Sequence, residues 1–542
     1  MEVGRTLLAR ASRVVSFHSG AAGTGDAPDA LLIVDGRIAA VGSAGELRPP
    51  PGAQVLDLPG ATITPGLTDA HIHVTEWALA RREVDVTPAT SPEDAARIVA
   101  AHGLTGTAGW VRGRGWNPHR WQNPTPARSL LDAVVPDRPV ALQSHDMHSV
   151  WVNSAALRLA GISADTPDPH GGRIVRDDLG SPTGLLQETA GQLIARCIPA
   201  PGHAEMLDAV ADAQLALHQL GITGIHSLPG ILVPEPDPLS ILEALRARDA
   251  LRLRVLQHLP LHFLDDAVKL GIRSGFGGDW IRIGGIKSFL DGTLGSRTAS
   301  MRWPYEGADD CGIRVIEATD FREAVRKAAR AGLATTVHAI GDAAVALAID
   351  VLAEPAQRVD AIPHRIEHVQ CFPAASDARA STSDDDRFDH ISRARITCSM
   401  QPAHLISDWR AADRLWGEAR ARWTYAFRSL LDRGALLAFG SDAPVEPADP
   451  RLGLFAATRR TDLAGEPAGG WFRSERIALE EAFRGYTVGP AIAAGRTGRE
   501  GQLTPGAVAD FVAWNTDPFA DGLDPLELSC ALTVVDGVVV HS

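Results

Sequence analysis

The chain has 542 residues, enough for a large hydrophobic core and for more than one domain. Hydrophobic residues make up 45% of it and charged residues 22%, values that are typical of a soluble globular protein. The net charge of −14, with no basic run, argues against a nucleic-acid-binding surface. No stretch approaches the roughly 20 apolar residues of a membrane span, so we expect no membrane partner either.

The cysteines and the first residues indicate the compartment. Five cysteines are scattered along the chain without a Cys-x-x-Cys motif, which argues against a disulfide framework or a structural zinc site. Residues 1–20 contain three arginines and no continuous apolar region, so we expect no signal peptide. Together these features predict a cytoplasmic protein.

Both ends of the chain are predicted to form short strands. An Asp-Gly pair, at residues 35–36 and again at 536–537, separates two apolar runs, which is typical of a β-hairpin. Each β segment is too short to be stable alone. We therefore expect residues 1–64 and 500–542 to pair into one small β-sandwich domain.

The chain between these ends alternates predicted strands and helices, which indicates parallel βα units. Eight such strands over residues 65–499 predict an α/β fold, a (β/α)8 TIM barrel. The alternative is a doubly wound open sheet, which is weakened because no Gly-x-Gly-x-x-Gly opens a helix after a strand. The predicted strands are Gly66–His73, Gly221–Ser227, Leu251–His258, Ile281–Phe289, Ala334–Ile340, Arg365–Gln370, Arg395–Met400 and Leu436–Asp442.

Strands one and two are separated by far more chain than a crossover needs. We expect an insertion over about residues 80–205, rich in Trp, Gly and Pro. An insertion after barrel strand 1 would lie at the barrel mouth, where active sites form, and would build a substrate lid.

His71 and His73 end the first predicted barrel strand. Residues i and i+2 of a strand point to the same face, so the two imidazoles could bind one metal ion. With 19 histidines in the chain, chance alone predicts roughly 0.7 such pairs, so two unrelated histidines remain the alternative. The pair therefore needs further ligands to be informative.

Four more strand ends supply candidates. Lys287 lies on strand four, His338 and His368 end strands five and six, and Asp442 ends strand eight. Singly, these residues have structural interpretations: core histidines, an ion-pair partner or a helix cap. Catalytic residues of a TIM barrel lie at the C-terminal ends of its strands. Five strands each place a candidate ligand at the same rim of the barrel, which favours a metal site.

Several motifs carry a family resemblance that covers almost the whole chain. They are Ile63–His73, Gly113–Trp116, His148–Leu157, Lys287–Ala299, Val337–Asp342, Arg365–His368, Gly440–Pro444 and Pro505–Phe511. The sequence resembles the amidohydrolase superfamily of metal-dependent hydrolases. Within it, the chain is similar to amidohydrolase family 3, the group that includes N-substituted formamide deformylases.

The resemblance implies a full ligand set for one or two divalent ions. One ion is implied on two histidines and an aspartate, and a second on two further histidines with a bridging lysine: His71, His73, Asp442, His338, His368 and Lys287. A free ammonium has no lone pair, so Lys287 could bridge only as N6-carboxylysine; unmodified, it would leave one ion. Imidazole and carboxylate ligands suit Zn²⁺ best, with Fe²⁺, Mn²⁺ and Ni²⁺ as alternatives.

The expected mechanism uses metal-activated hydroxide against a carbonyl carbon. Asp442 would accept the water proton and deliver it to the leaving amine. Candidate substrate contacts are Trp116, His148, Trp151, Asn153, Arg297 and His404. A core role for the tryptophans and a loop-anchoring role for Arg297 are the alternatives. Glu188 could point into the site or begin a helix.

One departure from the family pattern follows strand two. The group commonly has His-Asp there, whereas this chain has His226-Ser227. An acidic role at this position is therefore in doubt, and His226 could face the pocket or be structural.

The sequence thus predicts a hydrolase of non-peptide C–N bonds in a small-molecule amide, a linear N-substituted formamide or N-acyl amide being the leading substrate class. The step from group to substrate is by analogy, because one fold hosts many reactions. The alternatives are a hydrolase of cyclic amides, carbamates or esters with the same site, and a non-catalytic regulatory protein of the same fold. A homodimer is a common state for proteins of this kind, and the sequence itself does not specify the oligomeric state.

Overall fold

The structure is a computed structural model of the chain, and it describes residues 5–17, 27–103, 109–116, 121, 126–144, 149–169, 172–188, 190–229, 238–373 and 386–542. Contacts divide the chain into two units. Unit 1 comprises Met1–Val74 and Ala211–Ser542, and unit 2 comprises Thr75–Val210. The predicted insertion of about residues 80–205 falls within unit 2. Each of the six candidate metal ligands lies in unit 1.

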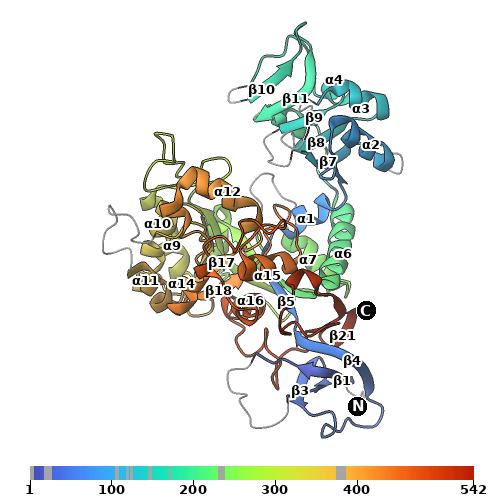
Figure 1. Cartoon of the computed structure of the whole chain (residues 1–542), viewed down its shortest axis with the longest axis vertical. Coiled ribbons are helices and arrows are strands. Elements are labelled where there is room, and N and C mark those ends of the chain that lie inside the picture. Colours follow the sequence, from blue (N-terminus) through green and yellow to red (C-terminus); the bar gives the residue numbers. More distant parts are fainter. Residues whose placement is uncertain are drawn as a thin grey trace. The chain divides into compact units, whose positions relative to one another are not determined.

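An eight-stranded parallel sheet forms the centre of unit 1 (Figure 1). Neighbouring strands follow one another in the chain, which is the order of a TIM barrel and not of a doubly wound sheet. The predicted (β/α)8 barrel is confirmed. Its strands are β5 (Leu67–Ile72), β12 (Ile222–Ser227), β13 (Arg254–Pro260), β14 (Ile281–Phe289), β15 (Thr335–Ala339), β16 (Arg365–His368), β17 (Thr397–Met400) and β18 (Leu436–Phe439).

Amphipathic helices alternate with the barrel strands. In α9 (Ala318–Arg330), for example, Phe321, Val325 and Ala328 are buried at the spacing that places them on one face. The other helices from the unit boundary onwards are α6 (His203–Gln219), α7 (Pro238–Ala247), α8 (Leu264–Lys269), α10 (Asp342–Leu352), α11 (Asp386–Ala394), α12 (His404–Trp416), α13 (Glu418–Ala421), α14 (Phe427–Asp432), α15 (Pro450–Arg459), α16 (Leu479–Gly485) and α17 (Val488–Ala493).

Two barrel strands end two or three residues earlier than the sequence predicted, and in both cases the backbone turns. His368 has φ 71° and Val369 has φ 46°, so β16 ends at His368 and not at residue 370. The chain leaves β18 after Phe439, and Asp442 has φ 63°. A positive φ takes the backbone out of the extended conformation and is costly for residues other than glycine. These turns occur at candidate metal ligands.

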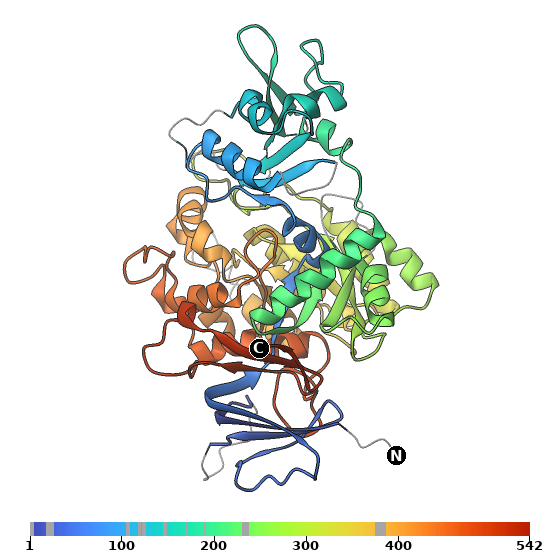
Figure 2. The same cartoon turned by 90° about the vertical axis from the view of Figure 1, so that its right-hand side faces the viewer.

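Strands from both ends of the chain join in one seven-stranded sheet (Figure 2). It is held together by the antiparallel pairing of β19 with β4. Apolar side chains from both ends, among them Ile33, Ile63, Phe511 and Val534, share one core. The two-layer sandwich stays a prediction. The strands, in sheet order, are β21 (Val538–His541), β20 (Cys530–Val535), β19 (Phe511–Trp514), β4 (Gln54–Pro65), β1 (Thr6–Val14), β2 (Ala30–Val34) and β3 (Arg37–Gly42).

Unit 2 has a sheet and a core of its own. Its mixed six-stranded sheet has the order β10 (Gly172–Arg176), β11 (Pro182–Glu188), β9 (Ser149–Val152), β8 (Val140–Ser144), β7 (Val111–Trp116) and β6 (Val84–Asp85). The unit also contains helices α2 (Pro92–Gly103), α3 (Arg128–Val134), α4 (Ser154–Leu159) and α5 (Gly191–Ala195), and α1 (Val74–Ala80) begins at its boundary. Buried tryptophans and aliphatic residues fill its core.

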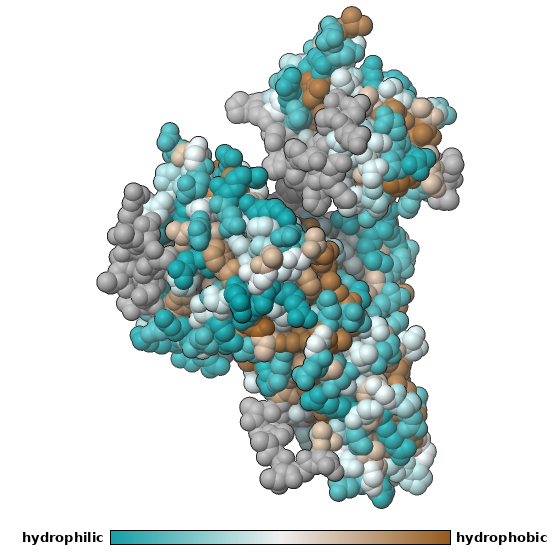
Figure 3. Space-filling view, in the orientation of Figure 1, coloured by the Kyte–Doolittle hydropathy of each residue, from teal (hydrophilic) through white to brown (hydrophobic). Residues whose placement is uncertain are grey.

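The surface of unit 1 carries many hydrophilic residues, as the composition of the chain leads one to expect. Hydrophilic residues cover much of the face of unit 1 shown in Figure 3, with smaller hydrophobic areas between them. Among the residues that the structure describes, no helix combines the length and the apolar character needed to cross a membrane.

The barrel closes where β5 meets the chain after β18. The amide of Asp442 donates to the carbonyl of His71 at 2.7 Å. The buried carboxylate of Asp69 accepts hydrogen bonds from the amides of His71 and Ser441, both at 3.0 Å, and from the Ser441 hydroxyl at 2.6 Å. A Cβ at Gly440 would lie 2.3 Å from the His71 amide nitrogen. Only glycine therefore permits this approach.

We expect Gly440→Ala to destabilise unit 1 by about 1–3 kcal/mol, because the added methyl group meets backbone that cannot move aside. Urea denaturation measures this change. Gly278→Ala is the matched control, since a Cβ there meets nothing within 4 Å, and it should change stability by less than about 0.5 kcal/mol. Equal urea midpoints for the two variants would contradict the close approach of Gly440 to the backbone of His71.

Candidate metal centre

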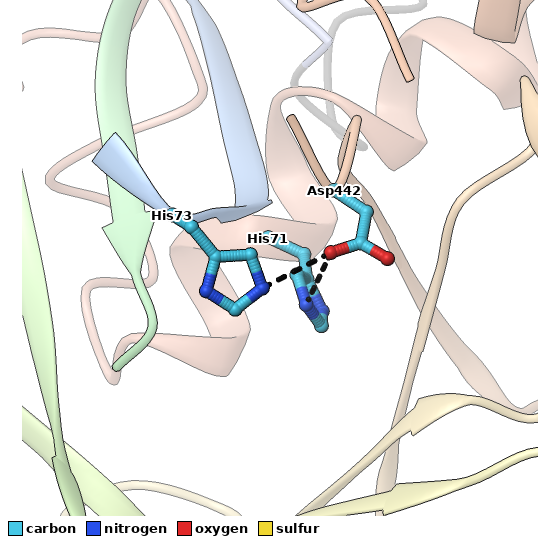
Figure 4. Close-up of side chains that lie close together, drawn as sticks. All are labelled: His71, His73 and Asp442. Atoms are coloured by element: carbon cyan, nitrogen blue, oxygen red, sulfur yellow. Dashed lines mark hydrogen bonds and ion pairs between the residues drawn. The ribbon is translucent and has the colours of Figure 1, made fainter. Parts of the chain in front are cut away.

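His71, His73 and Asp442 meet at the C-terminal rim of the barrel (Figure 4). Nε2 of His71 lies 3.2 Å and Nε2 of His73 lies 3.1 Å from the same oxygen, Oδ1 of Asp442. All three side chains are buried. Ligand atoms of these residues lie within 4.8 Å of one another, as the donors of a single ion do.

The local backbone explains why these side chains converge. His71 belongs to β5 and His73 follows its last residue, so the alternation of a strand turns both imidazoles to one face. The positive φ of Asp442 turns its carboxylate toward them from the other side of the barrel closure. Residues that are 369 positions apart in the chain thereby form one contact.

The charge state of Asp442 suits a cation. Burial alone would raise the pKa of its carboxyl group, but His71 and His73, which face it, hold that pKa well below its usual range. The carboxylate is therefore ionised. The histidine nitrogens that face it would give up their hydrogens to a bound cation, because metal binding releases protons from its ligands. Such a cluster fits a divalent cation placed among the donors, the arrangement that metal ligands require.

A second donor pair lies beside this cluster. The ring centroid of His368 is 4.4 Å from that of His338 and 5.1 Å from that of His71. Burial lowers the pKa of His338 to about 3 and that of His368 well below its usual value, so both imidazoles are neutral. Nε2 of His338 donates to the carbonyl of Gly292 at 2.9 Å, which leaves Nδ1 as the donor atom for a metal.

Lys287 is buried on β14, and its ammonium lies 4.5 Å from the centre of the Phe289 ring. Burial lowers the pKa of this amine to about 8, although the charges of Glu367 and Asp442 oppose that change. The Lys287 amine therefore loses its proton more easily than an ordinary lysine does, and it lies beside the histidines that could hold a second ion.

Two predicted substrate contacts lie in unit 1. His404 begins α12, and its Nε2 lies 3.6 Å from Oδ2 of Asp442, the oxygen that faces away from His71 and His73. That nitrogen has no hydrogen-bond partner among the described residues. Arg297 is exposed in the turn after β14, with φ 56°. Of the two, only His404 adjoins the cluster of ligands.

The predicted contacts in the insertion belong to the core of unit 2. Trp116 and Trp151 are buried, and Nε1 of Trp116 donates to the carbonyl of Leu142 at 2.8 Å. Asn153 caps α4, and its amide group also bonds to the backbone at Val140, Val135 and Arg138. These contacts give Asn153 a structural role within the unit. His148 lies outside the described residues.

Sequence reasoning missed a set of charged residues inside the barrel. Arg365 and Glu367 are both buried on β16 and form an ion pair. Arg365 also contacts Nδ1 of His226 at 2.7 Å, so His226 belongs to this interior network. The sequence did contain a sign of this ion pair: Arg365 and Glu367 lie at i and i+2 of a predicted barrel strand, and charged residues are seldom buried unless they are paired.

Comparison with known proteins identifies the class. Residues 54–541 match the model of the amidohydrolase family. The putative amidohydrolase YtcJ of Bacillus subtilis (strain 168) is 31% identical over 95% of this chain and 96% of its own length. The N-substituted formamide deformylase of Arthrobacter pascens is 28% identical over 94% of each chain. The crystal structure of an uncharacterized metal-dependent hydrolase from Pyrococcus horikoshii OT3 is 25% identical, with a TM-score of 0.76 over 96% of this chain and 99% of that one.

The chain therefore belongs to the amidohydrolase family, and the resemblance to amidohydrolase family 3 is confirmed. It is an enzyme, a metal-dependent hydrolase that acts on carbon–nitrogen bonds other than peptide bonds. The buried His71–His73–Asp442 cluster agrees with the requirement for a divalent metal.

Proposed function

We propose that the protein hydrolyses linear amides, N-substituted formamides or N-acyl amides, at a zinc centre on the barrel rim. His71, His73 and Asp442 would hold one ion, and His338 and His368 would hold a second, with carboxylated Lys287 between them. The observation that carries the metal site is the convergence of two Nε2 atoms on one oxygen of Asp442, at 3.1 and 3.2 Å. Imidazole and carboxylate donors of this kind suit Zn²⁺.

A bound divalent ion would lower the pKa of water and polarise the substrate carbonyl. The proton transfers would fall to Asp442, whose carboxylate is ionised and has one oxygen, Oδ2, turned away from the two histidines. Asp442 would take the proton of the attacking water and then protonate the leaving nitrogen, so that the C–N bond breaks to an acid and a free amine. His404, beside Oδ2, would face the substrate.

The state of Lys287 supports its carboxylation. With a pKa of about 8, roughly a tenth of the amine is neutral at pH 7, against less than about a thousandth for an ordinary lysine. The neutral nitrogen can attack the carbon of CO₂ and release a proton, which yields an anionic carbamate. Its oxygens would be suited to bridging two cations, which a free ammonium cannot do.

The substrate class is inferred from a relative and not from the metal ligands. It is supported by the 28% identity to the N-substituted formamide deformylase of Arthrobacter pascens over 94% of each chain. Cyclic amides, carbamates or esters remain the alternative, because the same ligand set can activate water against any of these carbonyl groups.

Substituting Asp442 with Asn should lower kcat by about 10²–10⁴-fold, because the amide cannot accept the proton of water. Zinc content should be largely retained, since the histidines remain. Turnover and zinc content are measured on the same preparation, with Asp265→Asn, at an exposed ion pair with Lys327, as the control. Full turnover with intact zinc would contradict the proposed role.

Lys287→Met should hold about one zinc ion per chain where the natural protein, prepared with bicarbonate, holds about two, because a thioether cannot be carboxylated. Zinc content measured by elemental analysis with and without bicarbonate tests this. Lys269→Met changes an exposed lysine and should behave as the natural protein. Two ions in Lys287→Met would contradict the bridging carbamate.

A hydrolysis screen on zinc-loaded protein tests the substrate class. We expect kcat/KM for N-substituted formamides or N-acyl amines to exceed that for cyclic amides, carbamates and esters by about tenfold or more, a difference of about 1.4 kcal/mol in the activation free energy. A preference for a cyclic amide, carbamate or ester would favour the alternative.

A further inference from the structure

A chain of charged groups lies inside the barrel behind His71. Oε2 of Glu367 is 2.6 Å from Nδ1 of His71, and Oε1 of Glu367 is 2.5 Å from Nε of Arg365. The side chains of all three residues are at most 1% exposed. Nδ1 is the nitrogen of His71 that faces away from Asp442, so this contact lies on the far side of the ring from the proposed metal.

The direction of the hydrogen bond follows from the chemistry of its partners. The carboxylate of Glu367 forms a buried ion pair with the guanidinium of Arg365, so it carries the negative charge and its oxygens can only accept hydrogen bonds. Nδ1 of His71 must then carry the hydrogen. The amide nitrogen of Gln401, at 3.1 Å, cannot donate to the same Nδ1, and it has the carbonyl of Ser399 at 3.3 Å as an acceptor.

This hydrogen bond selects the tautomer that a metal needs. A free neutral imidazole carries its hydrogen on either nitrogen, and only the form with hydrogen on Nδ1 leaves a lone pair on Nε2. In His71 that lone pair belongs to the atom 3.2 Å from Oδ1 of Asp442. The contact with Glu367 also fixes the rotation of the ring.

Glu367 is itself fixed by Arg365. One Nη atom of Arg365 donates to the carbonyl of Ala70 and to the hydroxyl of Ser399, both at 2.6 Å, and the other meets Nδ1 of His226 at 2.7 Å. The guanidinium on β16 is thereby tied to β5, β12 and β17. An ionised Glu367 at this depth requires such a counter-ion, because an unpaired buried charge is costly.

We propose that Glu367 is a positioning residue for the metal site, which sets the tautomer and orientation of His71, and that Arg365 keeps Glu367 ionised and in place. This inference rests on the proposed function, in which His71 is a metal ligand. Outer partners of this kind tune metal affinity by about 10–100-fold.

The test is a competition titration of Zn²⁺ against a chelator on the full-length protein. Glu367→Asp keeps the charge beside Arg365 but is one methylene too short to reach His71, so Zn²⁺ should bind about 10–100-fold more weakly. Glu367→Gln keeps the length but loses the charge that holds the hydrogen on Nδ1, and it should also bind more weakly.

The control is Asp510→Asn, which removes a buried carboxylate from an ion pair outside the metal site. Asp510 accepts from Arg254, the first residue of β13 and thus at the opposite end of the barrel. We expect Asp510→Asn to melt at a lower temperature than the natural protein but to bind Zn²⁺ with unchanged affinity. The control separates a loss of stability from a loss of ligand positioning.

The outcomes distinguish this inference from the proposed function. Natural affinity in Glu367→Asp would overturn the positioning role while leaving the metal site intact, and so would an equal loss in Asp510→Asn. If Glu367→Asp does not fold, Glu367→Gln decides: weaker Zn²⁺ binding supports the role and unchanged binding overturns it. A natural protein that binds no Zn²⁺ would instead contradict the proposed function and, with it, the inference.

Discussion

The buried ion pair between Arg365 and Glu367 is the interaction on which the interior of the barrel depends. A guanidinium at 1% exposure would be strongly destabilising without partners. Here it is matched by the Glu367 carboxylate and by acceptors on three other strands. Because Glu367 in turn contacts His71, the hydrogen bonds that hold the barrel together also orient a candidate metal ligand. Folding of the barrel and assembly of the site are therefore closely linked.

The same link is visible where the barrel closes. Asp69 bridges β5 to the chain after β18, Gly440 allows the two backbones to approach, and the His71 carbonyl accepts from the Asp442 amide. The first and last barrel strands thus meet at the residues whose side chains form the cluster. The backbone is left-handed at two of the candidate ligands, His368 and Asp442. Such strained positions are tolerated where the surroundings over-determine them, as they are at functional sites.

Much of this arrangement could be predicted from the sequence. The strand and helix periodicities gave the barrel, and the rule that catalytic groups lie at strand C-termini brought His71, His73 and Asp442 to one rim. The ends of β16 and β18 could not be predicted, because positive φ values at His368 and Asp442 arise from tertiary contacts. The Arg365–Glu367–His71 chain was also missed, since a pattern of residues does not show which charges face one another. Trp116 and Asn153 were considered as substrate contacts, and the structure places them in the core of unit 2.

The central claim is that a divalent ion sits among His71, His73 and Asp442. The most direct measurement is a crystal structure of the zinc-loaded protein, with diffraction recorded on both sides of the zinc absorption edge. The account predicts an anomalous peak bonded to Nε2 of His71, Nε2 of His73 and the carboxylate of Asp442. Zinc held by other residues, with no peak among these three, would contradict it.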